Sequence, residues 1–305
     1  MEVWVASDFP EDQIPNVKRA IKFWNSIANV KLIFKGKTSY TSDEMFYKQG
    51  CYWNINLPVK GIVVLEYPQS CGIVRNERGN AFVPAGYTLQ GRTEELVYVG
   101  IVEGERDLTT YIHEFGHAIG LKHPFEFGEP DTGDNPVYSI MQYTYRVIGA
   151  RSDVEVAQYL YGQPTDNYPM EIYEYNTADN YMHSRTYRGV CVFGGVYPFN
   201  AYVVEGDCTL KPTMDESQTC WEVYEGSSEN CTIEVSDSKG ETVRYTVAKL
   251  VTPFEPLPPS EGSSQGSSGS GGGGGCNTGS YEMAIAGLLA FLGKVIRRRI
   301  RRKSI

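Results

Sequence analysis

Three of the four histidines in this 305-residue chain lie in one short run, His113-Glu114-Phe115-Gly116-His117-Ala118-Ile119-Gly120-Leu121-Lys122-His123. Residues four apart lie on one face of a helix, so His113 and His117 can direct ring nitrogens at a single point about 2.0 to 2.1 Å from each. A glycine at position 120 allows the chain to leave the helix with positive φ and to bring His123 back toward that point. Three protein ligands leave a fourth position for water, which is the pattern of a catalytic zinc site.

The acidic residue beside the first histidine completes the pattern. Glu114 can accept a proton from a water at the fourth position. A bare His-x-x-x-His pair is often only a solvated or packed helix face, and even His-Glu-x-x-His arises by chance. The added glycine and third histidine favour the metal site, whereas His183 is expected to be an ordinary surface or packed residue.

The elements around the run predict a helix that can present these ligands. Asp107 is a candidate N-cap before Leu108. Apolar residues then recur at helical spacing on the face away from the ligands, namely Leu108, Ile112, Phe115 and Ile119. One face of the helix therefore packs against the core, and the other binds metal.

The run resembles the motif of the metzincin zinc peptidases, whose long consensus is HExxHxxGxxH followed by a methionine turn. The segment from Tyr138 to Tyr143 contains a matching methionine, Met141. The resemblance implies that Met141 forms a hydrophobic floor under the metal. It also implies that Tyr143, similar to a tyrosine of the astacin-like and serralysin-like branches, ligates zinc and then swings to the reacting carbonyl.

The resemblance implies an α/β (α+β) catalytic domain over residues 1–164, with a mixed sheet and a zinc helix. We expect strands at Val3–Val5, Val30–Phe34, Gly61–Glu66 and Leu96–Val102, a first helix at Pro15–Asn29, and a last helix at Asp153–Gly162 capped by Ser152. An extended peptide substrate is expected to add to an edge strand, with Leu96–Val102 as the candidate.

The chain departs from two branches of the family. It has no glycine- and aspartate-rich nonapeptide repeats of the kind that bind calcium in serralysin-like enzymes, and no pro-segment cysteine of the matrixin type. Four acidic residues between His123 and Met141 are candidate calcium ligands, although a solvated acidic loop is the preferred interpretation. They are Glu126, Glu129, Asp131 and Asp134.

Cysteine usage favours an exported protein. Seven cysteines stand at positions 51, 71, 191, 208, 220, 231 and 276, without any Cys-x-x-Cys pair, so disulfides are favoured over free buried thiols. Cys51 and Cys71 could close a loop in the catalytic domain, while the four cysteines from 191 to 231 allow three connectivities. Residues 1–25 lack an apolar segment of signal-peptide length, so we expect a trimmed or misassigned start.

The composition changes after the catalytic domain. Short runs rich in Val, Tyr and Thr predict a small β-sandwich-like accessory domain over residues 165–252. The runs are Tyr187–Phe193, Ala201–Val204, Cys220–Tyr224, Cys231–Val235 and Thr242–Val247. Such a module could bind a glycan, a protein or a surface, or could only hold the catalytic domain away from an anchor.

The C-terminal segment is predicted to tether the protein. A Pro/Gly/Ser-rich linker at 253–275 precedes residues 276–305, which contain Cys276, an apolar run at Met283–Ile296 and a basic end. This order is similar to GlyGly-type and Cys-containing sorting signals of bacterial surface proteins, which a membrane-embedded sorting protease cleaves. A permanent membrane anchor or an amphipathic surface helix are the alternatives.

The charge balance excludes one class of partner. Without residues 281–305, which hold seven basic side chains and one acidic one, the formal charge changes from −9 to −15. A body this acidic is a poor nucleic-acid binder.

These patterns together predict an exported, surface-associated zinc metalloendopeptidase that acts on protein or peptide substrates. The alternatives are a surface adhesion or binding protein whose metalloprotease domain is incidental or inactive, and a zinc hydrolase of a non-peptide amide.

Overall fold

The computed structural model describes residues 1–54, 56–68, 70, 79–82, 96–127, 137–142, 146–175, 187–224 and 226–248. The helices are α1 (Ile14–Ile27), α2 (Ser42–Met45), α3 (Leu108–Ala118) and α4 (Arg151–Tyr161). The strands are β1 (Glu2–Val5), β2 (Ile33–Lys37), β3 (Phe46–Tyr47), β4 (Tyr52–Trp53), β5 (Gly61–Tyr67), β6 (Gly79–Phe82), β7 (Leu96–Val102), β8 (Glu171–Tyr175), β9 (Tyr187–Phe193), β10 (Asn200–Glu205), β11 (Thr209–Pro212), β12 (Cys220–Tyr224), β13 (Asn230–Ser236) and β14 (Thr242–Ala248).

The first half of the chain forms a mixed five-stranded sheet in the order β2-β1-β5-β7-β6. The neighbours β2, β1, β5 and β7 pair in parallel, and β6 runs antiparallel to β7. The expectation that Leu96–Val102 is an edge strand is wrong, because β6 pairs along its outer side. The nearly continuous burial of β7 is typical of a strand inside a sheet.

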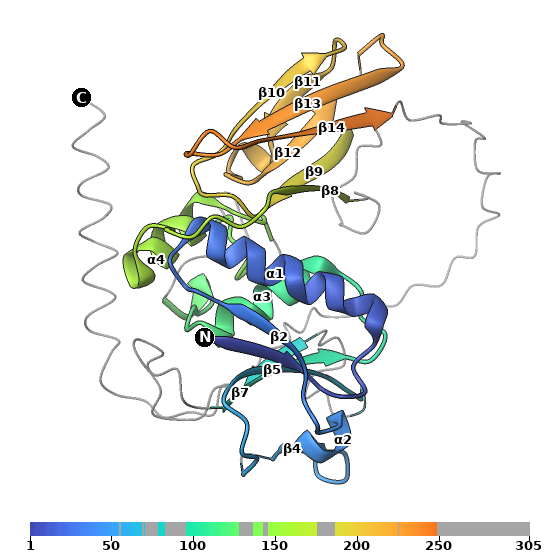
Figure 1. The fold of residues 1–305 in the computed structure, drawn as a ribbon, viewed down its shortest axis with the longest axis vertical. Coiled ribbons are helices and arrows are strands. Elements are labelled where there is room, and N and C mark those ends of the chain that lie inside the picture. Colours follow the sequence, from blue (N-terminus) through green and yellow to red (C-terminus); the bar gives the residue numbers. More distant parts are fainter. Residues whose placement is uncertain are drawn as a thin grey trace, which may run out of the picture.

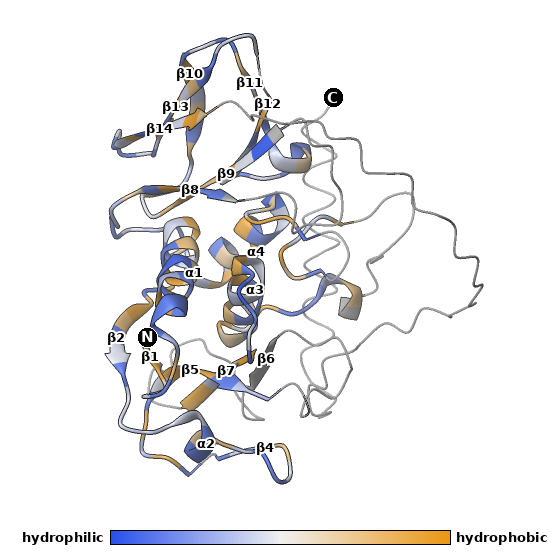
Figure 2. Ribbon diagram, turned by 90° about the vertical axis from the view of Figure 1, so that its right-hand side faces the viewer, coloured by the Kyte–Doolittle hydropathy of each residue, from blue (hydrophilic) through white to orange (hydrophobic). Residues whose placement is uncertain are grey.

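Helices α1 and α3 cover one face of this sheet (Figure 1). In α1, Pro15 stands in the first turn, and apolar residues such as Trp24 and Ile27 are buried, which gives the two-sided colouring of this helix in Figure 2. The following strand begins at Ile33, not at Val30. The reason is that the Asn25 side chain bonds both the N–H and the C=O of Leu32, at 2.8 Å each, so these groups are unavailable to the sheet.

The last helix of this half also differs from the sequence-based expectation at its start. Its N-cap is Ala150, and the Ser152 hydroxyl instead donates to the Tyr138 carbonyl at 2.9 Å. The expected end is confirmed, because Gly162 follows the helix with φ of +83°. Ser152 therefore ties α4 to the segment that precedes Met141.

Residues 165–248, called here the strand-rich region, contain two antiparallel sheets, β10-β13-β14 and β11-β12-β9-β8. Buried residues of both sheets form one cluster, which includes Val190, Trp221, Ile233 and Val247. All five predicted runs form strands, while β8 and β11 were not predicted.

Two disulfides settle the pairing that the sequence left open. Cys191 pairs with Cys220, and Cys208 pairs with Cys231. Cys51 is also disulfide-bonded. Cys71 and Cys276 lie outside the described residues.

Helices α1 and α3 lie between the five-stranded sheet and the strand-rich region (Figure 1). Glu171 at the start of β8 accepts from Arg19 at 3.2 Å and from Lys22 at 3.1 Å on α1. The main core also includes Phe193 of β9. The two halves of the chain therefore share a packed boundary.

Within the described residues, no helix is long and apolar enough to cross a membrane. The predicted linker at 253–275 and the predicted sorting signal at 276–305 lie outside those residues, as does His183.

Candidate metal centre

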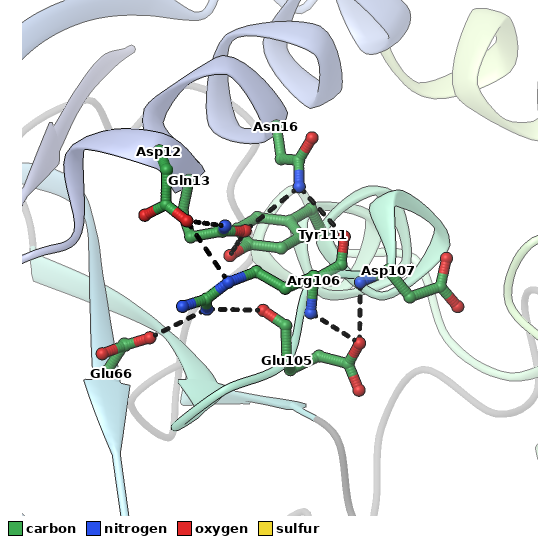
Figure 3. Close-up of polar contacts among 8 residues, drawn as sticks. All are labelled: Asp12, Gln13, Asn16, Glu66, Glu105, Arg106, Asp107 and Tyr111. Carbon is green, nitrogen blue, oxygen red and sulfur yellow. Dashed lines mark hydrogen bonds and ion pairs between the residues drawn. The ribbon is translucent and has the colours of Figure 1, made fainter. Parts of the chain in front are cut away.

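Helix α3 is fixed at its N-terminal end by a polar network (Figure 3). Asp107 is the N-cap, as the sequence predicted, and accepts from Thr109 N at 3.0 Å. Just before it, the Arg106 guanidinium lies 3.3 Å from Glu66 and 3.6 Å from Asp12. The start of the helix is thus held to both β5 and the turn before α1.

The same network continues under the helix through a buried tyrosine. The Tyr111 hydroxyl donates to Gln13 at 3.2 Å, and the Asn16 amide donates to both Gln13 and the Arg106 carbonyl (Figure 3). One turn further, Trp24 Nε1 donates to the Ile112 carbonyl at 3.0 Å. These bonds fix the height and rotation of α3 relative to α1, which determines where His113 lies.

The C-terminal end of α3 turns in the way the glycine predicted. Gly120 has φ of +94°, Leu121 N donates to Gly116 O at 2.9 Å, and Gly120 N donates to His117 O at 2.8 Å. This pair of bonds is the Schellman arrangement that closes a helix. A residue with a Cβ would be strained at this φ. The turn carries the chain back, so that His123 faces the helix.

The three histidines of the motif converge on one point. The Nε2 atom of His117 lies 3.1 Å from Nε2 of His113 and 3.2 Å from Nε2 of His123. Tetrahedral ligands at about 2.0 to 2.1 Å from zinc stand about 3.3 to 3.4 Å apart. The three nitrogens could therefore hold a metal ion.

For two of these rings, the contacts of Nδ1 show that this nitrogen carries a hydrogen. Nδ1 of His113 lies 2.8 Å from the Ile140 carbonyl, and Nδ1 of His117 lies 2.9 Å from the Leu121 carbonyl. A carbonyl oxygen can only accept, so each Nδ1 carries a hydrogen, and each ring in its neutral form presents a bare lone pair at Nε2. Burial, reinforced by His117, also lowers the pKa of His113 well below its usual value. Facing lone pairs at these distances suit a shared cation.

Met141 lies directly against the metal-binding helix. It is 1% exposed, and a Cβ built on Gly116 would come within 2.4 Å of its sulfur. Glycine inside a helix costs about 1 kcal/mol relative to alanine. The close approach of Met141 explains why glycine precedes His117.

The segment at 137–142, called here the floor segment, is held by a buried carboxylate. Asp153 of α4 accepts from the Ser139 hydroxyl at 2.5 Å and from Ile140 N at 2.7 Å. Ser139 Oγ in turn accepts from Met141 N at 2.9 Å. The peptide unit whose N–H makes this last bond is the one whose carbonyl accepts from His113, so hydrogen bonds connect Asp153 to a candidate ligand.

Asp153 and Ser139 were not recognised as functional from the sequence. An aspartate in the first turn of a helix is usually a solvated residue that favours the helix dipole. Its burial depends on the floor segment packing over it, which local sequence does not show. Gly116 was also overlooked, because the motif leaves that position unspecified and local sequence does not show the approach of Met141.

Glu114 is 3% exposed and lies on α3 beside His113. The side chains of Tyr143, Glu126, Glu129, Asp131 and Asp134 lie outside the described residues. Their expected roles in catalysis or calcium binding therefore stay predictions.

Gly116→Ala should destabilise the fold, because its Cβ would overlap the Met141 sulfur. Overpacking of a core costs about 1–3 kcal/mol, which exceeds the gain in helix propensity. Urea denaturation should therefore show a net loss of about 1–2 kcal/mol. In a Met141→Ala background the same change should cost less, because only the contact of the new Cβ with Trp24 Cζ2 at 3.0 Å remains. An equal cost in both backgrounds would contradict the contact.

Asp153→Asn should change how stability depends on pH. Burial raises the pKa of Asp153 to about 7, while the hydrogen bonds from Ser139 and Ile140 act in the opposite direction. Since the folded pKa exceeds the unfolded value of about 3.9, the stabilising contribution is complete below about pH 4 and is lost as pH rises to about 7. Between these limits the wild type should lose roughly 2 to 4 kcal/mol relative to the variant.

The measurement is urea denaturation of the metal-free proteins from pH 4 to 8, with Asp166→Asn, an exposed aspartate, as the matched control. A stability difference between wild type and Asp153→Asn that stays constant over this range would show that the carboxyl does not titrate as described.

No protein-family model matches the chain, and a search of the curated proteins returned no match. The resemblance to metzincins therefore rests on residues 107–162 and on the geometry of the three histidines.

Proposed function

We propose that this protein is an exported, surface-associated zinc endopeptidase of the metzincin type. The observation that carries the proposal is the convergence of three Nε2 atoms, together with the burial of Glu114 on α3. Two ligand rings keep their Nδ1 hydrogens on backbone carbonyls, which is the outer-sphere support that metal-binding histidines use.

In this proposal His113, His117 and His123 hold the ion, and Glu114 handles protons. Bound zinc supplies a Lewis acid and lowers the pKa of a coordinated water to about 7. Glu114 accepts the proton of the attacking water and returns it to the leaving amine. Burial excludes bulk water from this carboxylate, and Tyr143 would donate to the oxygen that becomes negative in the transition state.

The sheet offers a place for an extended substrate. Among the described strands β6, and not β7, is the edge strand on this side of the sheet, and it also contacts α3. A peptide that adds to such an edge is held by its backbone, which orients the scissile bond without reading every side chain.

The disulfides support the proposed compartment. Cys191–Cys220 and Cys208–Cys231 are both in the strand-rich region, and such bonds persist in oxidising environments. Surface attachment through the segment 276–305 is proposed on its sequence order alone.

Glu114→Ala should separate proton transfer from metal binding. Purified variant protein should retain about one zinc per chain by mass spectrometry of the intact complex, because Glu114 is not a ligand. Proteolysis of an unfolded protein substrate should fall about 10²- to 10⁴-fold. Glu155→Ala, a substitution at an exposed position of α4, serves as the matched control.

A ligand change gives the opposite pattern. His123→Ala should lose zinc itself, since a three-ligand site has no spare partner. Stoichiometric zinc with full activity in this variant, or zinc loss from a folded Glu114→Ala, would refute the assigned roles. Zinc binding without any proteolysis in the wild type would favour a binding protein with an inactive site.

Tyr143→Phe tests the proposed hydroxyl donor. If the hydroxyl acts only in the transition state, kcat should fall by roughly ten- to a thousandfold while KM changes little. Steady-state kinetics on a fluorogenic peptide provide the measurement, with Tyr159→Phe on the exposed face of α4 as the control. An unchanged kcat would assign Tyr143 to packing.

A further inference from the structure

Residues just before α4 are held by hydrogen bonds from the second half of the chain. Residues 146–150, called here the linking segment, lie against residues 213–220 of the strand-rich region, called here the brace loop. The Ser217 hydroxyl donates to the Ile148 carbonyl at 2.7 Å, and Gln218 N donates to the Gly149 carbonyl at 2.7 Å. Ala150 and Ser217 form an antiparallel bridge. Three consecutive residues of the linking segment are therefore held by two of the brace loop.

The fit at the centre of this contact leaves no room for a side chain at position 149. Gly149 has φ of +68°, and a Cβ added there would come within 2.1 Å of the Thr219 hydroxyl. Ser217 is 3% exposed and Thr219 is fully buried. A buried contact of backbone against side chain is typical of a fixed boundary, not of a module that moves on a tether.

The brace loop is itself rigidly supported. Ser217 Oγ accepts from Cys220 N at 2.9 Å and from Thr219 N at 3.2 Å, so one hydroxyl orders the loop and bonds the linking segment. Cys220 lies opposite Cys191 in the β12–β9 pair and is bonded to it. Val192 N donates to the Thr219 carbonyl at 2.9 Å. The brace loop is thus anchored in the sheet that contains β9.

Hydrogen bonds connect the linking segment to the floor segment. Arg146 Nε donates to the Gln142 carbonyl at 2.9 Å, and Val147 N lies 3.4 Å from the Ser139 carbonyl. The Ala150 carbonyl accepts from Asp153 N at 3.0 Å, at the start of α4. The same few residues therefore set the position of Ser139 and of Asp153, the pair that orients the Ile140 carbonyl against His113.

We infer that the strand-rich region helps to set the geometry of the metal centre. Ser217 and the Cys191–Cys220 disulfide position the linking segment and, through it, the Ile140 carbonyl that orients His113. Ser217 is a positioning residue, since it touches neither a ligand nor a substrate. The catalytic consequence rests on the proposed function, but the mechanical coupling does not.

The chain provides a matched control for the disulfide. Cys208–Cys231 closes a span of 23 residues and Cys191–Cys220 one of 29 residues, both within the strand-rich region. Loss of either bond releases similar chain entropy to the unfolded state. Only Cys191–Cys220 adjoins the brace loop. For the hydroxyl, Ser227 provides the control, because among the described residues its hydroxyl donates to Asp207, in another turn.

The test uses full-length protein carrying Ser217→Ala, Cys191→Ala with Cys220→Ala, Ser227→Ala, or Cys208→Ala with Cys231→Ala. Amide hydrogen exchange of the metal-free proteins should show residues 146–150 exchanging at least about tenfold faster in the first two only. Zinc affinity, measured by competition with a chromophoric chelator, should fall about tenfold in the same two, the lower end of the effect of losing an outer-sphere partner.

Kinetics then separate positioning from general destabilisation. In Ser217→Ala saturated with zinc, kcat should fall while KM for a peptide stays near the wild-type value, whereas both controls should match the wild type. If the cysteine variant at 191 and 220 does not fold, Ser217→Ala decides the question by exchange and zinc affinity.

Unchanged exchange at 146–150 together with unchanged zinc affinity in Ser217→Ala would overturn the inference. A wild type that neither binds zinc nor cleaves peptides would refute the proposed function alone. The exchange comparison would still decide the coupling in that case, because it is made without metal.

Discussion

The arrangement on which the rest of the structure depends is the convergence of three imidazole rings on one point. Nε2 of His117 lies 3.1 Å from Nε2 of His113 and 3.2 Å from Nε2 of His123, and ring lone pairs that face each other at such distances repel unless a cation lies between them. Rings in this arrangement need hydrogen bonds that fix their orientation. For His113 and His117, Nδ1 donates to the backbone carbonyls of Ile140 and Leu121, respectively. The position of these two carbonyls therefore determines whether the site can bind metal.

Each carbonyl is held by a different device. The one at Leu121 follows Gly120, whose positive φ ends α3 with two closing hydrogen bonds. The one at Ile140 belongs to a segment bonded by Ser139 and by the buried Asp153. Burial of a carboxyl is unfavourable, and hydrogen bonds offset only part of that cost.

The second half of the chain contributes to the same geometry. Helix α1 packs between the five-stranded sheet and the strand-rich region, with Glu171 bonded to Arg19 and Lys22 at the boundary. These pairs are partly exposed, so they contribute little energy and mainly fix orientation. The brace loop adds buried hydrogen bonds at the linking segment. The strand-rich region can thus affect the geometry of the histidine cluster through the backbone that it holds.

The sequence by itself determined the local parts of this site. The spacing of His113 and His117, the Asp107 cap and the turn at Gly120 depend on dihedral angles and helical periodicity, which neighbouring residues set, and the structure has all three. The strands expected at Gly61–Glu66 and Leu96–Val102 are likewise apolar runs, and the structure has both, the first extended to Tyr67.

Only the tertiary structure decided which strand forms the edge of the sheet, which cysteines pair, and why Asp153 and Ser217 are buried. These features join residues far apart in the chain. Pairing of β6 on β7, the approach of Met141 to Gly116 and the contact of the brace loop with Gly149 follow from how packed layers meet. No local pattern encodes such contacts, because each partner by itself is an ordinary polar, small or apolar residue.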